Sequence, residues 1–182
     1  PGENIPWNRV VKMMREQTNL AEQADFTTVW LTEHHFAHNG YLNAPPNPIM
    51  MSLDLASPSK KIRVGQAPIV LPDWHPLRVA EDVALLDNMT EGRVDFGVAK
   101  GINERVTLQF KKEADRRDNE KSYRLFMESL EVILKAWTQD PFSHKGEFYE
   151  FPVPGWKETN RFLMPLEKEY HSEDGEYTGM YI

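Results

Sequence analysis

The sequence contains no cysteine, no long apolar run and no excess of basic residues, and each absence excludes a class of protein. Without cysteine there are no disulfides, thiolate metal ligands or cysteine nucleophiles, which fits a reducing cytoplasm. No run approaches the roughly 20 apolar residues of a membrane span, and no secretory signal is visible. A net charge of −7 argues against nucleic acid, because a phosphate backbone requires a basic surface. We therefore expect a cytoplasmic protein that binds neither nucleic acid nor membranes.

The order of apolar segments predicts the fold class. Strand-like segments begin near residues 27, 62 and 93, and a helix-like segment follows each of them. Short strands that alternate with helices indicate parallel crossovers, as in a doubly wound sheet or a (β/α)8 barrel. A closed barrel needs roughly 250 residues, more than the 182 present. We expect an α/β fold that covers roughly the N-terminal half of a (β/α)8 TIM barrel, within a longer working protein.

Local patterns give approximate boundaries for these elements. Asn8 is placed to cap a first helix, and Pro48 and Pro76 are placed to open later ones. The expected helices are residues 8–24, 48–56, 76–89 and 121–137; the expected strands are 27–31, 62–71 and 93–99. Residues 103–119 form a polar connection, and short hairpins follow Pro141. We treat residues 1–182 as one domain in which 151–182 is a loop insertion.

The segment Val29–Phe36 (VWLTEHHF) is the most informative part of the chain. Its apolar residues read as a strand, so Glu33, His34 and His35 follow at its carboxyl end. In parallel sheets that end is where ligands bind. Histidine exchanges protons near neutral pH, so the segment predicts a chemical site. Since neighbouring strand residues point to opposite faces, we expect only one of the two imidazoles to face the barrel axis.

Three motifs in order resemble the bacterial luciferase-like flavin-dependent monooxygenases. They are VWLTEHHF, the third-strand sequence GQAPIVLP at residues 65–72, and the block from His75 to Gly101. The helix at 124–137 is similar as well. The resemblance implies a TIM barrel that binds reduced FMN, activates O2 and oxidises a small organic substrate. It also implies a separate flavin reductase and a homodimer. Some relatives use the deazaflavin F420 instead.

The resemblance also assigns roles to residues. His34 and His35 would be catalytic, and His34 would lie against the flavin; a structural histidine is the competing interpretation. Ala67-Pro68 would form a cis peptide that supports the isoalloxazine ring, because proline inside a central strand requires a bulge or a similar departure. The competing interpretation is a trans proline at a strand end.

Three further residues are expected at the flavin phosphate. Lys100 occupies the position at which the family usually has arginine. Lysine keeps the positive charge but cannot form the bidentate hydrogen bonds that arginine makes with a phosphate. Gly101 follows it at the end of the strand. Arg124 resembles a phosphate-binding arginine, although an ion pair with Glu128 on the same helix competes with that role. A solvated surface lysine remains the alternative for Lys100.

A metal site is not expected. Glu33, His34, His35 and His38 are close in sequence, but they lie where a strand runs into a loop. The helical order His-Glu-x-x-His of zinc proteases is absent.

Three functions remain open at this stage. The first is an FMN-dependent monooxygenase, the second an F420-dependent oxidoreductase of the same fold, and the third a truncated, non-catalytic flavin-binding protein. The residues that would select a substrate are not recognisable in this chain.

Overall fold

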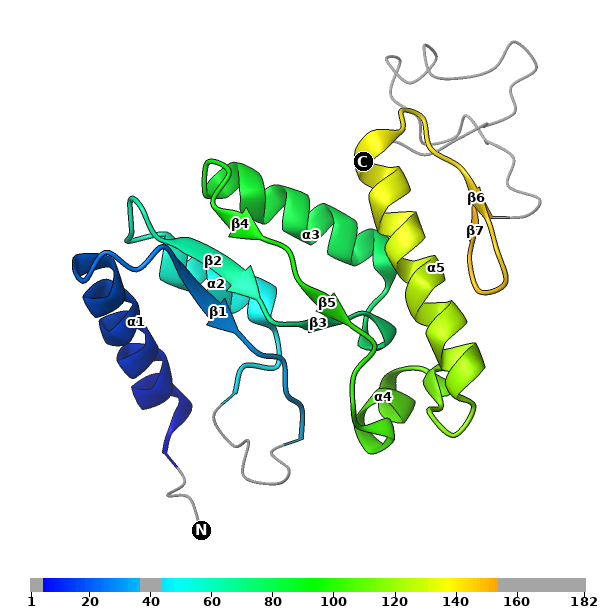
Figure 1. The fold of residues 1–182 in the computed structure, drawn as a ribbon, viewed down its shortest axis with the longest axis horizontal. Coiled ribbons are helices and arrows are strands. Elements are labelled where there is room, and N and C mark those ends of the chain that lie inside the picture. Colours follow the sequence, from blue (N-terminus) through cyan, green and yellow to red (C-terminus); the bar gives the residue numbers. More distant parts are fainter. Residues whose placement is uncertain (1–4, 37–43, 154–182) are drawn as a thin grey trace, which may run out of the picture.

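A computed structural model describes residues 5–36 and 44–153 (Figure 1). Its helices are α1 (Trp7–Gln23), α2 (Pro48–Ala56), α3 (Pro76–Met89), α4 (Glu104–Phe110) and α5 (Asn119–Thr138), with two 3-10 turns, η1 (Leu71–Asp73) and η2 (Lys112–Ala114). The strands are β1 (Thr28–Leu31), β2 (Arg63–Gln66), β3 (Ile69–Val70), β4 (Val94–Asp95), β5 (Val98–Ala99), β6 (His144–Lys145) and β7 (Glu150–Phe151). Within these ranges no helix is both long and apolar enough to cross a membrane.

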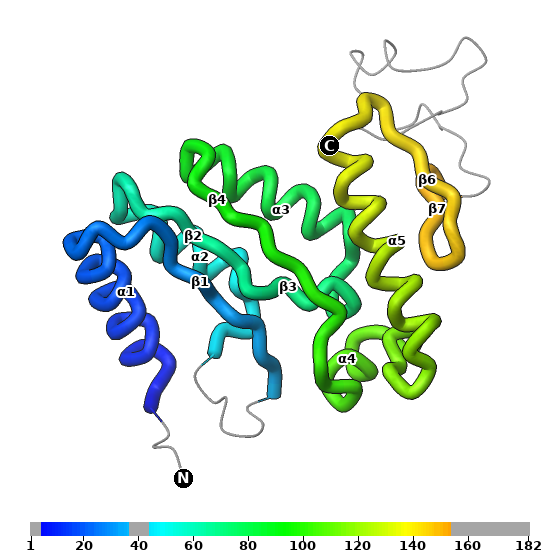
Figure 2. Tube along the Cα trace, in the orientation of Figure 1, coloured from blue at the N-terminus to red at the C-terminus, as the bar shows by residue number. Residues whose placement is uncertain are grey.

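The strands confirm the predicted parallel α/β arrangement. β1, β2 and β4 form one parallel sheet, in which Trp30 pairs with Gly65 and Gly65 pairs with Asp95. β3 and β5 form a second, two-stranded parallel sheet that continues in the same direction (Figure 2). The carboxyl ends of β1, β3 and β5 therefore approach one another, as the strand order of the sequence predicts.

Two expected strands are each divided into two. The segment 62–71 breaks between β2 and β3 at the cis peptide Ala67-Pro68, where proline has no N–H to donate to the ladder. The segment 93–99 breaks opposite it, between β4 and β5. There the N–H of Ile69 donates to the carbonyl of Gly97 at 2.8 Å, and a β-carbon on Gly97 would lie only 2.1 Å from the carbonyl oxygen of Gln66. The alternation of Val94, Phe96 and Val98 did not reveal this close approach.

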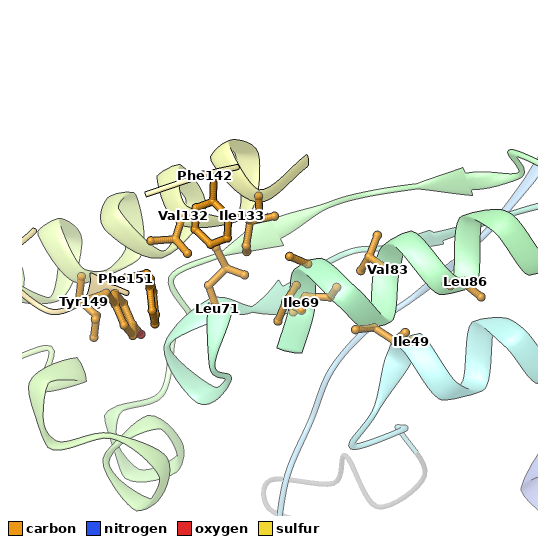
Figure 3. Packing of buried hydrophobic residues seen from close by; sticks show 14 of the residues in the cluster. Ile49, Ile69, Leu71, Val83, Leu86, Val132, Ile133, Phe142, Tyr149 and Phe151 are labelled. Atoms are coloured by element: carbon orange, nitrogen blue, oxygen red, sulfur yellow. The ribbon is translucent and has the colours of Figure 1, made fainter. Parts of the chain in front are cut away.

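The main core lies between the sheet, α3 and α5 (Figure 3). Ile69 and Leu71 from the end of the second sheet are buried against Val83 of α3 and Ile133 of α5. Phe142, after α5, is 1% exposed and closes the core. Burying each such side chain contributes roughly 1.5–3 kcal/mol, so these contacts hold α3 and α5 on one face.

The other face of the first sheet carries the side chain of Trp30. Leu31 and Val64 pack against Leu55 of α2, so the alternating residues Trp30 and Gly65 point away from that helix. Trp30 is 56% exposed. The strand that the sequence predicted to be buried is therefore covered by a helix on one face and open on the other within the described residues.

Four local expectations need correction. Asn8 does not cap α1: Pro6 occupies the capping position, and the amide oxygen of Asn8 accepts only from the N–H of Arg9 at 2.8 Å. Residues 103–119 are not merely a polar connection, because Asn103 caps α4 through the N–H of Arg105. The helical spacing of apolar residues in 121–137 puts Leu134 on the same side as Leu125 and Ile133, but Leu134 lies outside the buried face of α5, being 47% exposed. The expected ion pair of Arg124 is formed with Glu147 rather than Glu128.

Glu128 instead anchors the hairpin β6–β7 to α5. Its carboxylate accepts the backbone N–H groups of Glu147, Phe148 and Tyr149 at 2.8–3.1 Å. It also bonds Nε2 of His144 at 3.2 Å. The antiparallel hairpin agrees with the expected short hairpins after Pro141. Most of the expected insertion at residues 151–182 lies outside the described residues.

Candidate functional site

A cavity of about 230 Å³ lies at the carboxyl ends of β1, β3 and β5. One wall comes from the residues after β1, a second from the Ala67-Pro68 peptide with Val70, and a third from Ala99 and Gly101. Residues at the start of α4 and within it close the remaining side. The cavity thus lies where parallel α/β folds bind their ligands.

His34 and His35 both line this cavity. The expectation that only one of the two imidazoles faces the barrel axis stays a prediction. Strand geometry ends at Leu31, and the alternation of side chains ends with it. Phe36 then takes a left-handed backbone with φ of 61°, which turns the chain away. The backbone N–H of His34 donates to the carbonyl of Pro45 at 3.3 Å, and this bond holds the segment against the entry to α2.

Glu33 is the anchor of the segment. Its side chain is fully buried and accepts three hydrogen bonds. The N–H of Val70 donates to Oε2 at 2.9 Å; the indole N–H of Trp74 donates to Oε1 at 2.9 Å; and Nε2 of His35 lies 2.7 Å from Oε1. These donors compensate a buried negative charge and tie the end of β1 to β3 and η1.

His35, rather than His34 next to it in the sequence, is the imidazole that Glu33 orients. The side chain of His35 is 12% exposed. Its ring also packs against the ring of Phe110 of α4, with centroids 4.8 Å apart. If Nε2 carries the proton that Glu33 accepts, Nδ1 is the acceptor nitrogen. A fixed tautomer of this kind is what a proton acceptor in a cavity requires.

The Ala67-Pro68 peptide is cis, as predicted, and both residues line the cavity. Gly101 lines it from the opposite side. Its φ of 80° favours glycine, and a β-carbon there would lie 2.8 Å from Cγ1 of Val70. These small residues leave a mostly apolar space at the strand ends.

Lys100 and Arg124 are not among the residues that line this cavity. Lys100 lies between the lining residues Ala99 and Gly101, and its ammonium donates to the side chain of Asn119 at 2.6 Å, at the start of α5. Arg124 lies further along α5 and pairs with Glu147 at 2.7 Å. The structure therefore brings Lys100 close to the cavity but places Arg124 in a separate surface ion pair.

Sequence reasoning missed Asp73, the last residue of η1. Asp73 lines the cavity, and both of its carboxylate oxygens are buried without a hydrogen-bond partner in the part of the chain that the structure describes. Burial, and secondly the charge of Glu33, raises the pKa of Asp73 to about 7. The sequence did offer one signal for Asp73: it is an acidic residue directly after the expected strand 62–71 and Pro72, at the strand end where ligands bind.

Glu33, His35 and Asp73 each offer one possible metal-ligand atom within 4.8 Å of one another. However, the offered atoms of Glu33 and His35 already bond to each other, and the other contacts of Glu33 come from N–H donors. This arrangement is that of a hydrogen-bonded carboxylate, so we assign no metal to it. His38, which the sequence analysis considered as a possible metal ligand, lies outside the described residues.

The family model for luciferase-like monooxygenases matches residues 4–166. The chain belongs to this family. It is 34% identical over 143 residues to the alkanal monooxygenase alpha chain of the Kryptophanaron alfredi symbiont, covering 79% of this chain and 38% of that protein. It is 30% identical over 139 residues to the oxygenase component of the flavin-dependent trigonelline monooxygenase of Acinetobacter baylyi, covering 76% and 37% respectively.

Solved structures show the same partial fold. The oxygenating constituent of 3,6-diketocamphane monooxygenase from Pseudomonas putida, in complex with FMN, matches 80% of this chain and 39% of its own, with a TM-score of 0.70 and 20% identity. The coenzyme F420 dependent tetrahydromethanopterin reductase of Methanopyrus kandleri matches 77% and 40%, with a TM-score of 0.57 and 20% identity. The chain thus spans about two-fifths of the length of the relatives it matches.

Proposed function

We propose that this member of the luciferase-like family takes part in a flavin-dependent monooxygenase reaction, in which a small organic substrate is oxidised with O2 and reduced FMN. The observation that supports this most is the cavity itself. It joins His34 and His35 to the cis Ala67-Pro68 peptide and Gly101 at the ends of parallel strands. The FMN named in the Pseudomonas putida structure supports the choice of cofactor.

The residues present fit a flavin ring. Ala67, Pro68, Val70 and Ala99 offer apolar surface on which the isoalloxazine would rest, and Gly101 lets a ring approach the backbone closely. Lys100, beside the cavity, would face the phosphate. Its ammonium would give up the hydrogen bond to Asn119 and donate to the phosphate instead. Arg124 would reach phosphate only by giving up Glu147, so its predicted role requires that pair to break.

When bound, reduced flavin supplies the electrons that activate oxygen. The protein would supply position, exclusion of water and proton control. His34, which lines the cavity, would hydrogen-bond the flavin ring. His35, oriented by Glu33, would accept or return a proton at Nδ1. The apolar walls would keep water from the reacting atoms.

The proposal extends to the whole protein. Residues 1–182 would form the N-terminal half of a (β/α)8 barrel as one domain, with 151–182 as a loop insertion. A flavin reductase would deliver the reduced cofactor in the cytoplasm. A homodimer would form through α2 and α3, where Met50, Leu85 and Met89 are 57–70% exposed beside a shared groove.

An F420-dependent oxidoreductase is the second candidate function, supported by the fold match to the Methanopyrus kandleri reductase. The two reactions differ in their need for oxygen. Hydride transfer from a deazaflavin proceeds without O2, whereas monooxygenation does not. A non-catalytic flavin-binding protein is the third.

Absorption and fluorescence titration of the purified protein with FMN tests the proposal first. Addition of a flavin reductase and NADH, with oxygen uptake measured for a panel of aldehydes, ketones and aromatic acids, tests it second. Uptake that depends on substrate supports a monooxygenase. Anaerobic turnover with reduced F420 supports the second candidate, and flavin binding without either turnover supports the third. Failure of the folded protein to bind either FMN or F420 would refute all three.

A further inference from the structure

The carboxyl group of Asp73 has an unusual environment. Both oxygens are buried, and neither has a hydrogen-bond partner among the described residues. The residue nevertheless lines the cavity. An ionised carboxylate in such a place is unfavourable, because water no longer solvates it and no donor replaces the water. Either a proton or a cation must balance it.

The neighbours of Asp73 favour a proton. Glu33 and His35 each place a ligand atom within 4.8 Å of the Asp73 carboxyl group. Glu33 receives the N–H groups of Val70 and Trp74 and a bond from His35, so the negative charge is stabilised on Glu33. Asp73 has no comparable donors. Of two neighbouring carboxyl groups, the one without donors retains the proton.

We propose that Asp73 and Glu33 hold one proton between them, carried by Asp73, and that Asp73 acts through Glu33 as a positioning residue for His35. With Asp73 neutral, the ring of His35 faces one negative charge and bonds it through Nε2. A second carboxylate at this distance would compete with Glu33 for the Nε2–H of His35. The proton on Asp73 therefore leaves the bond between His35 and Glu33 undisturbed, and with it the tautomer in which Nδ1 is the acceptor.

The charges around Asp73 agree with this coupling. Burial and the charge of Glu33 raise its pKa, and the charge of His35 lowers it. None of the described residues that line the cavity is lysine or arginine, so no permanent cation there offsets a second carboxylate. The consequence for catalysis rests on the proposed function, whereas the sharing of the proton does not require a flavin.

Carbon-13 NMR of the protein labelled at aspartate carboxyl groups tests the proposal directly. The Asp73 signal is identified by its absence from D73N. We expect its midpoint near the pKa of about 7 given above. In E33Q the midpoint should fall, because the repelling charge is gone. A midpoint in the ordinary aspartate range, or one that E33Q does not shift, would overturn the proposal.

The alternative, a cation, is tested with the metal alone. Calorimetric titration with Zn²⁺ or Mn²⁺ at pH 7 should show no stoichiometric binding that D73N abolishes. Binding of that kind would replace the shared proton by a metal site. If D73N proves unstable, E33Q serves as a second variant. Glutamine keeps one acceptor oxygen and the volume of the glutamate side chain.

The pH dependence of activity distinguishes the proposed role of Asp73 from a purely structural one. Because a group with a midpoint near neutrality controls the acceptor, kcat/KM of the wild type should fall by about tenfold between pH 6 and pH 8, and D73N should lose most of that dependence. Equal pH dependence in both proteins would overturn the role of Asp73. If the NMR midpoints behave as expected but FMN does not bind, the proposed function fails while the shared proton stands.

Discussion

The indole ring of Trp30 occupies the space that a side chain on Gly65 would need. The two residues pair on neighbouring parallel strands, and a β-carbon on Gly65 would lie 2.4 Å from Cε3 of Trp30. A contact that short does not occur between real atoms, so either the ring or the strand would have to move. The absence of a side chain at Gly65 is therefore what allows the tryptophan to cover this part of the sheet.

Gly65→Ala should lower the free energy of unfolding by about 1–3 kcal/mol, the usual cost of overpacking. Urea denaturation measures the loss, and the emission of the tryptophans reports the displaced ring. In a Trp30→Ala background the same substitution should cost at least about 1 kcal/mol less, because the clash is gone. An equal cost in both backgrounds would show that strand backbone, rather than the indole, excludes the methyl group.

Glu33→Ala should destabilise the protein by at least about 2 kcal/mol, because two buried N–H groups and the His35 ring lose a charged acceptor. Urea denaturation at pH 7 provides the measurement. Glu16→Ala is the matched control, since the side chain of Glu16 is 61% exposed and its change should stay within about 0.5 kcal/mol. Similar values for the two variants would remove Glu33 as the anchor of the site.

Lys100→Met should weaken FMN binding about tenfold, or ~1.4 kcal/mol, and should leave riboflavin binding unchanged, because only FMN carries the phosphate. Fluorescence titration with both flavins separates the ring from the phosphate contribution. Arg124→Met is the comparison: its partner is Glu147, so we expect less than about a threefold effect. A selective loss of FMN affinity in Arg124→Met would instead support the phosphate role that the resemblance implies for it.

Asp73 should make the protein less stable as the pH rises. Its pKa is raised from 3.8 to about 7, so the folded state binds this proton more tightly than the unfolded chain. The resulting penalty is absent below about pH 4, grows as the pH rises and is complete above about pH 7.

Asp73→Asn removes this titration. Relative to the wild type, the variant should gain about 1–2 kcal/mol between pH 5 and pH 8, measured by urea denaturation at both values. Asp115→Asn is the control, because the bond to Arg117 lowers the pKa of Asp115 to about 2 and its titration is complete below this range. Parallel behaviour of the two variants would contradict the assignment to Asp73.

Much of the fold could be predicted because it depends on local patterns. Proline at the first helical turn located the starts of α2 and α3. A short apolar run located β1, and the helical spacing of apolar residues located α5. The division of two strands was not predictable in this way, because it depends on Gly97 approaching the backbone of Gln66 across the sheet. Single-sequence patterns carry no information about such distant contacts.

The site was predictable to the extent that it follows strand ends. His34, His35, Ala67, Pro68 and Gly101 lie together because parallel strands end at one edge. Asp73 was missed because its importance arises from burial among residues about forty positions away in the sequence. Roles in catalysis and cofactor binding remain predictions for all of these residues.

The hydrogen bonds from the hairpin β6–β7 to Glu128 have a consequence for how the sequence of this region can change. The carboxylate accepts hydrogen bonds from main-chain N–H groups, which every residue except proline possesses. Position 147, which is exposed, can therefore exchange its side chain for any residue but proline without losing this bond, whereas position 128 has to retain a carboxylate of that length. Tyr149 is constrained independently, because its side chain is buried in the main core. Divergence among relatives should therefore spare both Glu128 and Tyr149.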